Sequence, residues 1–171
     1  DKRLAYENSM RVPMLIRYPK SFKDRSIISE QCLNIDVAPT ILEMAGIEKP
    51  AYMQGESMLG LLNGEDDHDW RKSFLFEYYK DAAWPHAGPN QVAVRTKDYK
   101  LVESFIKNDI DELYDLKNDP GEMNNLINDP RFNEKEKELR LESLRLQKKY
   151  KYNPDRDWHL RTIVKARKSN N

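Results

Sequence analysis

Hydrophobic and polar positions alternate with the two-residue period of β-strands in the second half of the chain. Runs rich in aromatic and β-branched side chains predict strands at residues 73–79, 91–95, 99–103 and 112–116. The last three runs are joined by short connections, which favour antiparallel neighbours. The pattern therefore predicts a four-stranded antiparallel meander, with a hairpin turn at residues 96–98.

Helical spacing of apolar residues marks two segments in the first half. The first begins at Asp36, whose carboxylate can cap the free amides of the first helical turn, and ends at Gly46. Its apolar positions share one face and predict a core helix: Val37, Ile41, Met44 and Ala45. A shorter helix is expected to follow Ser57, as its cap, and to end at Leu62.

The longest helical pattern covers residues 133–150. Asn133 and Glu136 have the spacing of a capping box, which would satisfy free amides at the start of the helix. Two glutamates are followed by arginines at favourable spacing, in the pairs Glu136–Arg140 and Glu142–Arg145. Apolar residues lie on two nearly opposite faces: Leu139, Leu146 and Tyr150 on one, Leu141 and Leu144 on the other. Such a helix packs against two partners, and we expect the meander on one face and a further domain on the other.

A short apolar run, Met14–Ile16, lies between Pro13 and Pro19. Continuous apolar residues fit a buried strand that is covered on both faces, as in the centre of a parallel sheet. One strand cannot make a sheet, so its neighbours are expected upstream of residue 1. Together, the elements predict an α+β fold in which a four-stranded antiparallel sheet is packed by a long C-terminal helix and preceded by a strand and helices.

Composition narrows the classes of partner. Basic and acidic residues number 29 each among 171, so no net field draws the protein to nucleic acid or to an anionic membrane. No apolar run approaches the length of a membrane span. The single cysteine, Cys32, excludes an intramolecular disulfide and is expected to act as a small buried hydrophobe.

Residues 80–90 carry side chains suited to binding a sugar. Two prolines and a glycine preclude regular structure there, and the loop holds Trp84 and His86 before a predicted strand that contains Arg95. An indole stacks on sugar faces and an imidazole bonds hydroxyl groups, so Trp84, His86 and Arg95 are candidate substrate-binding residues. The alternative is that Trp84 covers a satellite core and that His86 is merely exposed.

The acidic clusters are expected to be structural. Residues 65–69 hold consecutive carboxylates without the alternate spacing and turn glycine of a calcium loop, so a solvated loop is expected rather than a cation site. Asp115 and Asp119 border a turn and are expected to fix it by capping, not to act in catalysis. No metal site is therefore expected in this chain.

Several motifs, taken in order, resemble those of the formylglycine-dependent sulfatases. The similarity extends as far as Leu126 and is carried by four groups of residues: Lys2-Arg3 with Tyr6-Glu7 and Arg11-Val12-Pro13; Asn34-Ile35-Asp36 with Pro39-Thr40 and Ala45-Gly46-Ile47; Gln54-Gly55-Glu56-Ser57; and Glu112–Leu116 with Asp119-Pro120, Glu122 and Asn125-Leu126. Among these enzymes the chain is similar to carbohydrate sulfatases, including the N-acetylglucosamine-6-sulfatases.

The resemblance implies a division of the chain and a role for Lys2. Residues 1–72 would be the end of a catalytic α/β sulfatase domain of the alkaline-phosphatase-like type. Residues 73–153 would form a C-terminal sheet-and-helix subdomain, and residues 154–171 a basic tail. In this family a lysine at this place in the motif contacts the sulfate group, which makes Lys2 the candidate catalytic residue. Glu7 and Arg11 are interpreted as a local ion pair that shapes the turn.

The resemblance also implies cofactors and partners that this chain does not supply. The formylglycine nucleophile is made from Cys or Ser followed by x-Pro-x-Arg, whereas Cys32 is followed by Leu33-Asn34-Ile35-Asp36. The calcium ligands are likewise expected in a missing N-terminal sulfatase domain, so the fragment alone is expected to be inactive. The implied substrate is a sulfated carbohydrate or an aryl sulfate, and the implied location is periplasmic, secreted or lysosomal.

Two other functions stay open on the sequence. Residues 84–90 depart from the histidine-containing pattern of the N-acetylglucosamine-6-sulfatases, which leaves that specificity open. The chain could belong to a related phosphate or phosphonate ester hydrolase, or be a non-catalytic carbohydrate-binding or interaction module. A Cys/Ser-x-Pro-x-Arg segment in the preceding sequence would indicate a formylglycine enzyme.

Overall fold

A computed structural model of the chain describes residues 4–19, 22, 27–65, 69–79, 91–104 and 110–153. The chain divides into two compact units that alternate in sequence. Residues 1–12 join residues 73–171 in the first, which we call the sheet unit, and residues 13–72 form the second, the helical unit.

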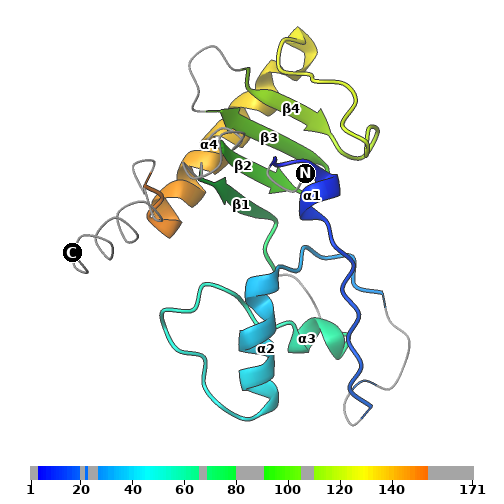
Figure 1. Cartoon of the computed structure of the whole chain (residues 1–171), viewed down its shortest axis with the longest axis vertical. Helices are drawn as coiled ribbons and strands as arrows, with labels where there is room; N and C mark the ends of the chain where they lie inside the picture. The colour runs from blue at the N-terminus through cyan, green and yellow to red at the C-terminus, as the bar shows by residue number, and fades with distance from the viewer. Residues whose placement is uncertain are drawn as a thin grey trace, which may run out of the picture. The chain divides into compact units, whose positions relative to one another are not determined.

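The sheet unit is built on four antiparallel strands in the order β1-β2-β3-β4 (Figure 1). The strands are β1 (Ser73–Tyr78), β2 (Gln91–Thr96), β3 (Tyr99–Ser104) and β4 (Glu112–Asp115). Each strand pairs with the next one along the chain. Thr96 closes the β2–β3 turn, because its hydroxyl accepts a hydrogen bond from the Tyr99 amide at 3.1 Å. The predicted meander is confirmed.

Helix α4 (Asn133–Tyr150) covers one face of this sheet (Figure 1). Alternate strand residues and one stripe of the helix form a core in which each side chain is at most 1% exposed: Val94, Leu101, Leu113, Leu139 and Leu146. Burying one such side chain contributes roughly 1.5–3 kcal/mol, so this interface is a major source of stability in the sheet unit. The predicted helix is confirmed, as are its ion pairs Glu136–Arg140 at 2.8 Å and Glu142–Arg145 at 2.6 Å.

The start of α4 differs from the prediction. A 3₁₀ turn, η2 (Pro130–Phe132), leads into the helix, so Asn133 is already helical and cannot act as its cap. The carboxylate of Asp129 caps η2 instead, accepting a hydrogen bond from the Arg131 amide at 3.0 Å. The predicted capping box of Asn133 and Glu136 is therefore wrong.

The second apolar face of α4 is open to solvent. Leu141 is 69% exposed, and Leu144 is similarly exposed. Within the described part of the sheet unit, nothing covers this strip. The further domain expected on this face stays a prediction.

The helical unit contains a 3₁₀ turn, η1 (Asn34–Asp36), followed by α2 (Val37–Met44) and then α3 (Leu59–Leu62). The predicted helix after Asp36 exists, but its apolar face is not a core face, since Ile41 is 59% exposed. Its buried side is formed by Pro39 and Thr40. The predicted short helix ends at Leu62 as expected, but its N-cap is Met58, without a side-chain capping bond, so the predicted cap Ser57 is wrong. The Ser57 hydroxyl accepts a hydrogen bond from the Leu59 amide at 3.2 Å just before the helix. None of the helices in the described ranges is both long and apolar enough to cross a membrane.

The apolar run Met14–Ile16 does not form the predicted strand. Its backbone belongs to no strand ladder among the residues that the structure describes, and Leu15 is 98% exposed. A strand needs neighbours that pair with its amides and carbonyls. Met14–Ile16 is therefore not a strand among the described residues, and the buried strand with neighbours upstream of residue 1 stays a prediction.

Candidate functional site

Charged side chains lie on the sheet face opposite α4, next to the β2–β3 turn. Arg95 on β2 and Lys100 on β3 are cross-strand partners, and Tyr114 on β4 is next to Lys100 in register. Residues paired in this way point to the same side of the sheet. Lys100 is fully buried there, and a buried lysine requires a negatively charged partner.

Residues 4–10 supply that partner. They cross this face of the sheet and end in the one-turn helix α1 (Glu7–Met10) (Figure 1). The Glu7 carboxylate accepts hydrogen bonds from Arg95 Nη2 at 3.0 Å, from Arg95 Nε at 3.2 Å and from Lys100 Nζ at 3.3 Å. Glu122 forms an ion pair with Lys100, and its carboxylate accepts the Glu7 backbone amide at 2.6 Å. We call Glu7, Arg95, Lys100 and Glu122 the anchor cluster.

These contacts correct the interpretation of Glu7 as the local partner of Arg11. Its partners Arg95 and Lys100 lie 88 and 93 positions away in sequence. Arg11 is exposed, whereas Glu7 is buried against the sheet. The spacing of the two residues favours a local pair, but burial brings Glu7 to strand residues instead. The predicted Glu7–Arg11 ion pair is wrong.

The anchor cluster should make stability depend on pH. Burial alone would raise the pKa of Glu7, but the hydrogen bonds from Arg95 and the charge of Lys100 outweigh it and hold this pKa below its ordinary value of 4.5. A lowered folded-state pKa stabilises the fold above the unfolded-state pKa, and this contribution is lost as pH falls through the folded-state pKa. We expect the stability difference between wild type and Glu7→Gln to be full at neutral pH and to shrink below pH 4.5. Urea unfolding of both proteins at a series of pH values measures this stability difference. A difference that grows on acidification would contradict a stabilising role for the ionised Glu7 carboxylate.

Tyr6 adds a second connection between the segment and the sheet. Its hydroxyl donates to Glu112 Oε1 at 3.2 Å, and the Tyr114 hydroxyl donates to Glu112 Oε2 at 3.1 Å. The two rings meet edge to face, with centroids 6.3 Å apart. Burial, and next the charge of Glu112, raises the pKa of Tyr6, so the phenol keeps its proton and remains a donor.

The beginning of the segment lies against the beginning of β2. Ala5 is buried and packs with Ala93 and Val102. Its amide donates a hydrogen bond to Gln91 Oε1 at 3.4 Å. Gln91 directly follows residues 80–90 in sequence. The contact therefore joins the polypeptide that follows Lys2 to the polypeptide that follows the predicted sugar-binding loop.

One of the predicted site residues belongs to the described structure. Arg95 is part of the anchor cluster, and its remaining nitrogen, Nη1, donates to Thr96 O at 2.9 Å. Lys2, Trp84 and His86 lie outside the described residues, and so does the tail from residue 154 onward. The role of Lys2 in catalysis stays a prediction, and so does substrate binding by Trp84, His86 and Arg95.

Sequence reasoning misses Lys100 and Glu122 as partners of Glu7. The alternation in β3 places Lys100 on the same face as the apolar Val102, which is the available signal that this lysine is buried. Glu122 lies in a turn and has a positive φ of 56°. No periodic pattern connects either residue to the N-terminal segment.

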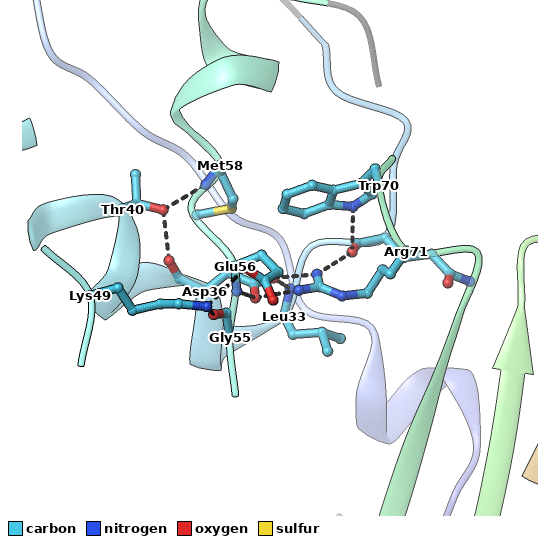
Figure 2. Close-up of polar contacts among 10 residues, drawn as sticks. Leu33, Asp36, Thr40, Lys49, Gly55, Glu56, Met58, Trp70 and Arg71 are labelled. Carbon is cyan, nitrogen blue, oxygen red and sulfur yellow. Dashed lines mark hydrogen bonds and ion pairs between the residues drawn. The ribbon is translucent and has the colours of Figure 1, made fainter. Parts of the chain in front are cut away.

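A second group of buried polar side chains lies in the helical unit (Figure 2). Asp36 is fully buried, and its carboxylate accepts hydrogen bonds from two nitrogens of Arg71 at 2.5 and 2.6 Å. The same carboxylate accepts the amides of Leu33 at 2.7 Å and Glu56 at 2.9 Å. Asp36 precedes α2 but makes no capping bond to its first turn, so the predicted capping role of its side chain is wrong. The side chain joins three separate segments instead.

The segments around Asp36 are packed closely. The Thr40 hydroxyl donates to Asp36 O at 2.6 Å and accepts the Met58 amide at 2.9 Å (Figure 2). At Gly55, a Cβ atom would lie only 2.0 Å from Ile35 O, so a glycine is required there. Since these polar groups form hydrogen bonds with one another, we interpret this region as a structural element and not as a binding or catalytic site.

The remaining candidates from the sequence are structural as well. Asp115 Oδ1 accepts the amides of Lys117 and Asn118, each at 3.1 Å, and Asp119 accepts the Asn124 amide at 2.8 Å, which confirms their turn-capping role. Cys32 is partly buried, and burial raises the pKa of its thiol. In the acidic run at 65–69, residues 66–68 lie outside the described ranges. Within those ranges, no group of three or more His, Cys, Asp or Glu side chains could hold a metal ion.

Comparison with known sequences gives a family. Residues 1–149 match the family described as N-sulphoglucosamine sulphohydrolase, C-terminal. The N-acetylglucosamine-6-O-sulfatase of Bacteroides thetaiotaomicron is 42% identical over 160 residues, which cover 91% of this chain and 28% of that protein. The human N-acetylglucosamine-6-sulfatase is 39% identical over 79 residues, covering 46% of this chain and 14% of that one. The chain therefore spans less than a third of the length of these relatives.

Solved structures lead to the same family. One of them, described as a complex with its substrate D-glucosamine-2-N,6-O-disulfate, matches with a TM-score of 0.84 at 39% identity, over 92% of this chain and 32% of that one. The phosphonate monoester hydrolase SpPMH of Silicibacter pomeroyi matches with a TM-score of 0.60 at 26% identity, over 70% of this chain and 26% of that one. The four-stranded sheet with its long C-terminal helix is thus a fold found in sulfatases. The chain belongs to the N-sulphoglucosamine sulphohydrolase C-terminal family, which is the C-terminal region of the sulfatases.

Proposed function

We propose that this chain is the C-terminal part of a carbohydrate sulfatase, which hydrolyses sulfate esters on glycans, and that Lys2 binds the sulfate group. The observation that carries the proposal is the 42% identity to an N-acetylglucosamine-6-O-sulfatase over 91% of the chain. A relative of similar fold has D-glucosamine-2-N,6-O-disulfate as its substrate. A sulfated glucosamine is therefore the substrate class to test first.

Lys2 would place an ammonium group beside the sulfate. Negative charge builds on the oxygens as a sulfate ester bond breaks, and a preplaced cation lowers the barrier. Trp84, His86 and Arg95 are proposed to contact the sugar. The hydrogen bond between Ala5 and Gln91 supports a shared site, because it brings together the polypeptide that follows Lys2 and the polypeptide that follows the loop.

The remaining groups are proposed to come from the rest of a longer protein. Formylglycine would supply the nucleophile, and calcium would neutralise sulfate oxygens. The residues described here offer no set of three metal ligands, so none of them is assigned to calcium. Residues 1–72 would complete the catalytic domain, residues 73–153 its C-terminal subdomain, and residues 154–171 a basic tail. The intact enzyme would act in the periplasm, the lysosome or outside the cell.

Replacing Lys2 by alanine in the full-length protein is expected to lower kcat for sulfate release from glucosamine-6-sulfate about 100- to 1000-fold, as for other groups that stabilise a developing anion. Lys97→Ala, in the exposed β2–β3 turn, is the matched control and should keep wild-type activity. The isolated chain should release no sulfate. Full activity of the Lys2→Ala protein, or turnover by the isolated chain, would overturn the proposal.

A phosphonate or phosphate ester hydrolase is the second candidate. The match to SpPMH favours it, although the 26% identity of that structure is below the 39% of the sulfatase relative. Parallel assays of the full-length protein with a sulfate ester and a phosphonate monoester separate the two. A protein that turns over neither ester would instead fit a non-catalytic carbohydrate-binding or interaction module.

A further inference from the structure

We propose that Glu7 is a positioning residue for Lys2. By accepting hydrogen bonds from Arg95 and Lys100, it fixes the backbone that follows Lys2 against the sheet. This inference rests on the proposed function, in which Lys2 binds sulfate. Lys2 itself lies outside the described residues, and the contacts of residues 4–10 carry the proposal.

Residues 4–10 depend on the sheet for their conformation. Helix α1 has only one turn, and so short a helix does not persist in water without tertiary contacts. Glu7 contributes both its carboxylate and its backbone amide to the anchor cluster. Hydrogen bonds between charged groups are the strong ones, so Glu7 is the main fixed point of the segment.

The anchor cluster balances two negative and two positive charges. Glu7 and Glu122 face Arg95 and Lys100, and the Lys100 and Glu122 side chains are 0% and 3% exposed. Glu7→Gln removes one charge with little change in size and leaves Lys100 with Glu122 alone. We expect the sheet to stay folded, because its main apolar core with α4 lies on the other face. The N-terminal segment, in contrast, would lose its fixed position.

The opposite face of the sheet offers a matched control. Glu103 on β3 accepts hydrogen bonds from Arg140 at 3.3 Å and from the Ser143 hydroxyl at 2.5 Å, both on α4. Like Glu7, it is a sheltered carboxylate that joins a second element to the sheet. Its partners hold α4, so Glu103→Gln should cost stability without disturbing residues 4–10.

The test compares Glu7→Gln and Glu103→Gln in the full-length enzyme, each alone and combined with Lys2→Ala. Since a misplacement of about 1 Å can lower a rate roughly 100-fold, we expect Glu7→Gln to lower kcat about 10- to 100-fold with a smaller change in KM. In the Lys2→Ala background it should lower kcat no further, because the group that it positions is gone. Glu103→Gln should keep kcat in both backgrounds while lowering Tm. If Glu7→Gln fails to fold, Glu122→Gln should repeat the pattern, because it leaves both cations on the Glu7 carboxylate and alters the acceptor of the Glu7 amide.

Several results would overturn the inference while leaving the proposed function standing. One is wild-type kcat for a folded Glu7→Gln enzyme. Others are an equal loss of kcat with and without Lys2, which indicates a general loss of active protein, and an equal loss in Glu103→Gln. If the wild-type protein releases no sulfate, or if Lys2→Ala stays fully active, the proposed function fails and the inference with it.

Discussion

Replacing Asp36 by alanine is expected to destabilise the helical unit by about 3–5 kcal/mol, because it removes one partner of a buried ion pair and leaves the other in place. The carboxylate is fully buried, and all of its hydrogen bonds are lost in the variant. The Arg71 side chain, only 14% exposed, would keep a positive charge without its carboxylate partner. The amides of Leu33 and Glu56 would lose their acceptor as well.

Urea unfolding followed by the fluorescence of Trp70 measures this loss. The Arg71 guanidinium lies 4.5 Å from the centroid of the Trp70 ring, and Trp70 becomes the only indole once Trp84 and Trp158 are replaced by phenylalanine. Glu56→Ala is the control, since it removes an exposed carboxylate that pairs with Lys49 at the surface and leaves the amide bound to Asp36 intact. This control should cost less than about 1 kcal/mol. Equal midpoints for the two variants would show that the Asp36 network contributes no more than a surface pair.

Replacing Lys100 by methionine is expected to destabilise the sheet unit by about 3–5 kcal/mol, for the same electrostatic reason with the opposite sign of charge. Lys100 is fully buried between Glu7 and Glu122. Methionine preserves much of the side-chain volume, so lost packing contributes little. In the variant, Glu7 and Glu122 are still sheltered from solvent, but Arg95 is the one remaining cation of the anchor cluster, and it pairs with Glu7.

A double variant distinguishes the charge effect from a packing effect. Glu122→Gln in the Lys100→Met background should restore part of the stability, because it removes one uncompensated carboxylate. Lys97→Met, in the exposed β2–β3 turn, should change stability by less than about 0.5 kcal/mol. Calorimetric Tm values and urea midpoints of the four proteins measure these differences. A double variant less stable than Lys100→Met would contradict the electrostatic explanation.

Much of the sheet unit could be predicted from local patterns. The strands alternate in polarity and the last three are joined by short connections, so the positions of the strands and the antiparallel order of β2, β3 and β4 follow from neighbouring residues. Leu139 and Leu146 recur at helical spacing and identify the packed face of α4. The cap of that helix could not be predicted in the same way, because the 3₁₀ turn η2 starts the helical path before Asn133.

The helical unit was harder to predict because several of its apolar side chains are not covered by any other part of the described chain. Met14–Ile16 and the Val37 and Ile41 face have the composition of buried elements, yet they are exposed. A pattern records that a surface is apolar, but not which part of a protein covers it. Relatives more than three times as long as this chain are consistent with partners outside it.

The candidate site could be predicted only at the level of its motif. The resemblance identifies Lys2, Tyr6 and Glu7, but the partners of Glu7 lie 88 or more positions away. Periodicity gives the face on which Lys100 lies, and it does not give the residue that faces it. Only the folded sheet brings these charges together.

The alternation of the two units along the sequence has a practical consequence for dissecting the protein. A truncation that begins at Ser73 keeps every strand and α4, yet it strips the cover from Ala93 and Val102 and leaves Arg95 and Lys100 without Glu7. Protein produced from such a boundary would display a bare sheet surface on which Arg95 has lost its carboxylate partner and Lys100 keeps only Glu122. Recombinant production of this half should therefore supply the first twelve residues as well, for example as a co-expressed peptide.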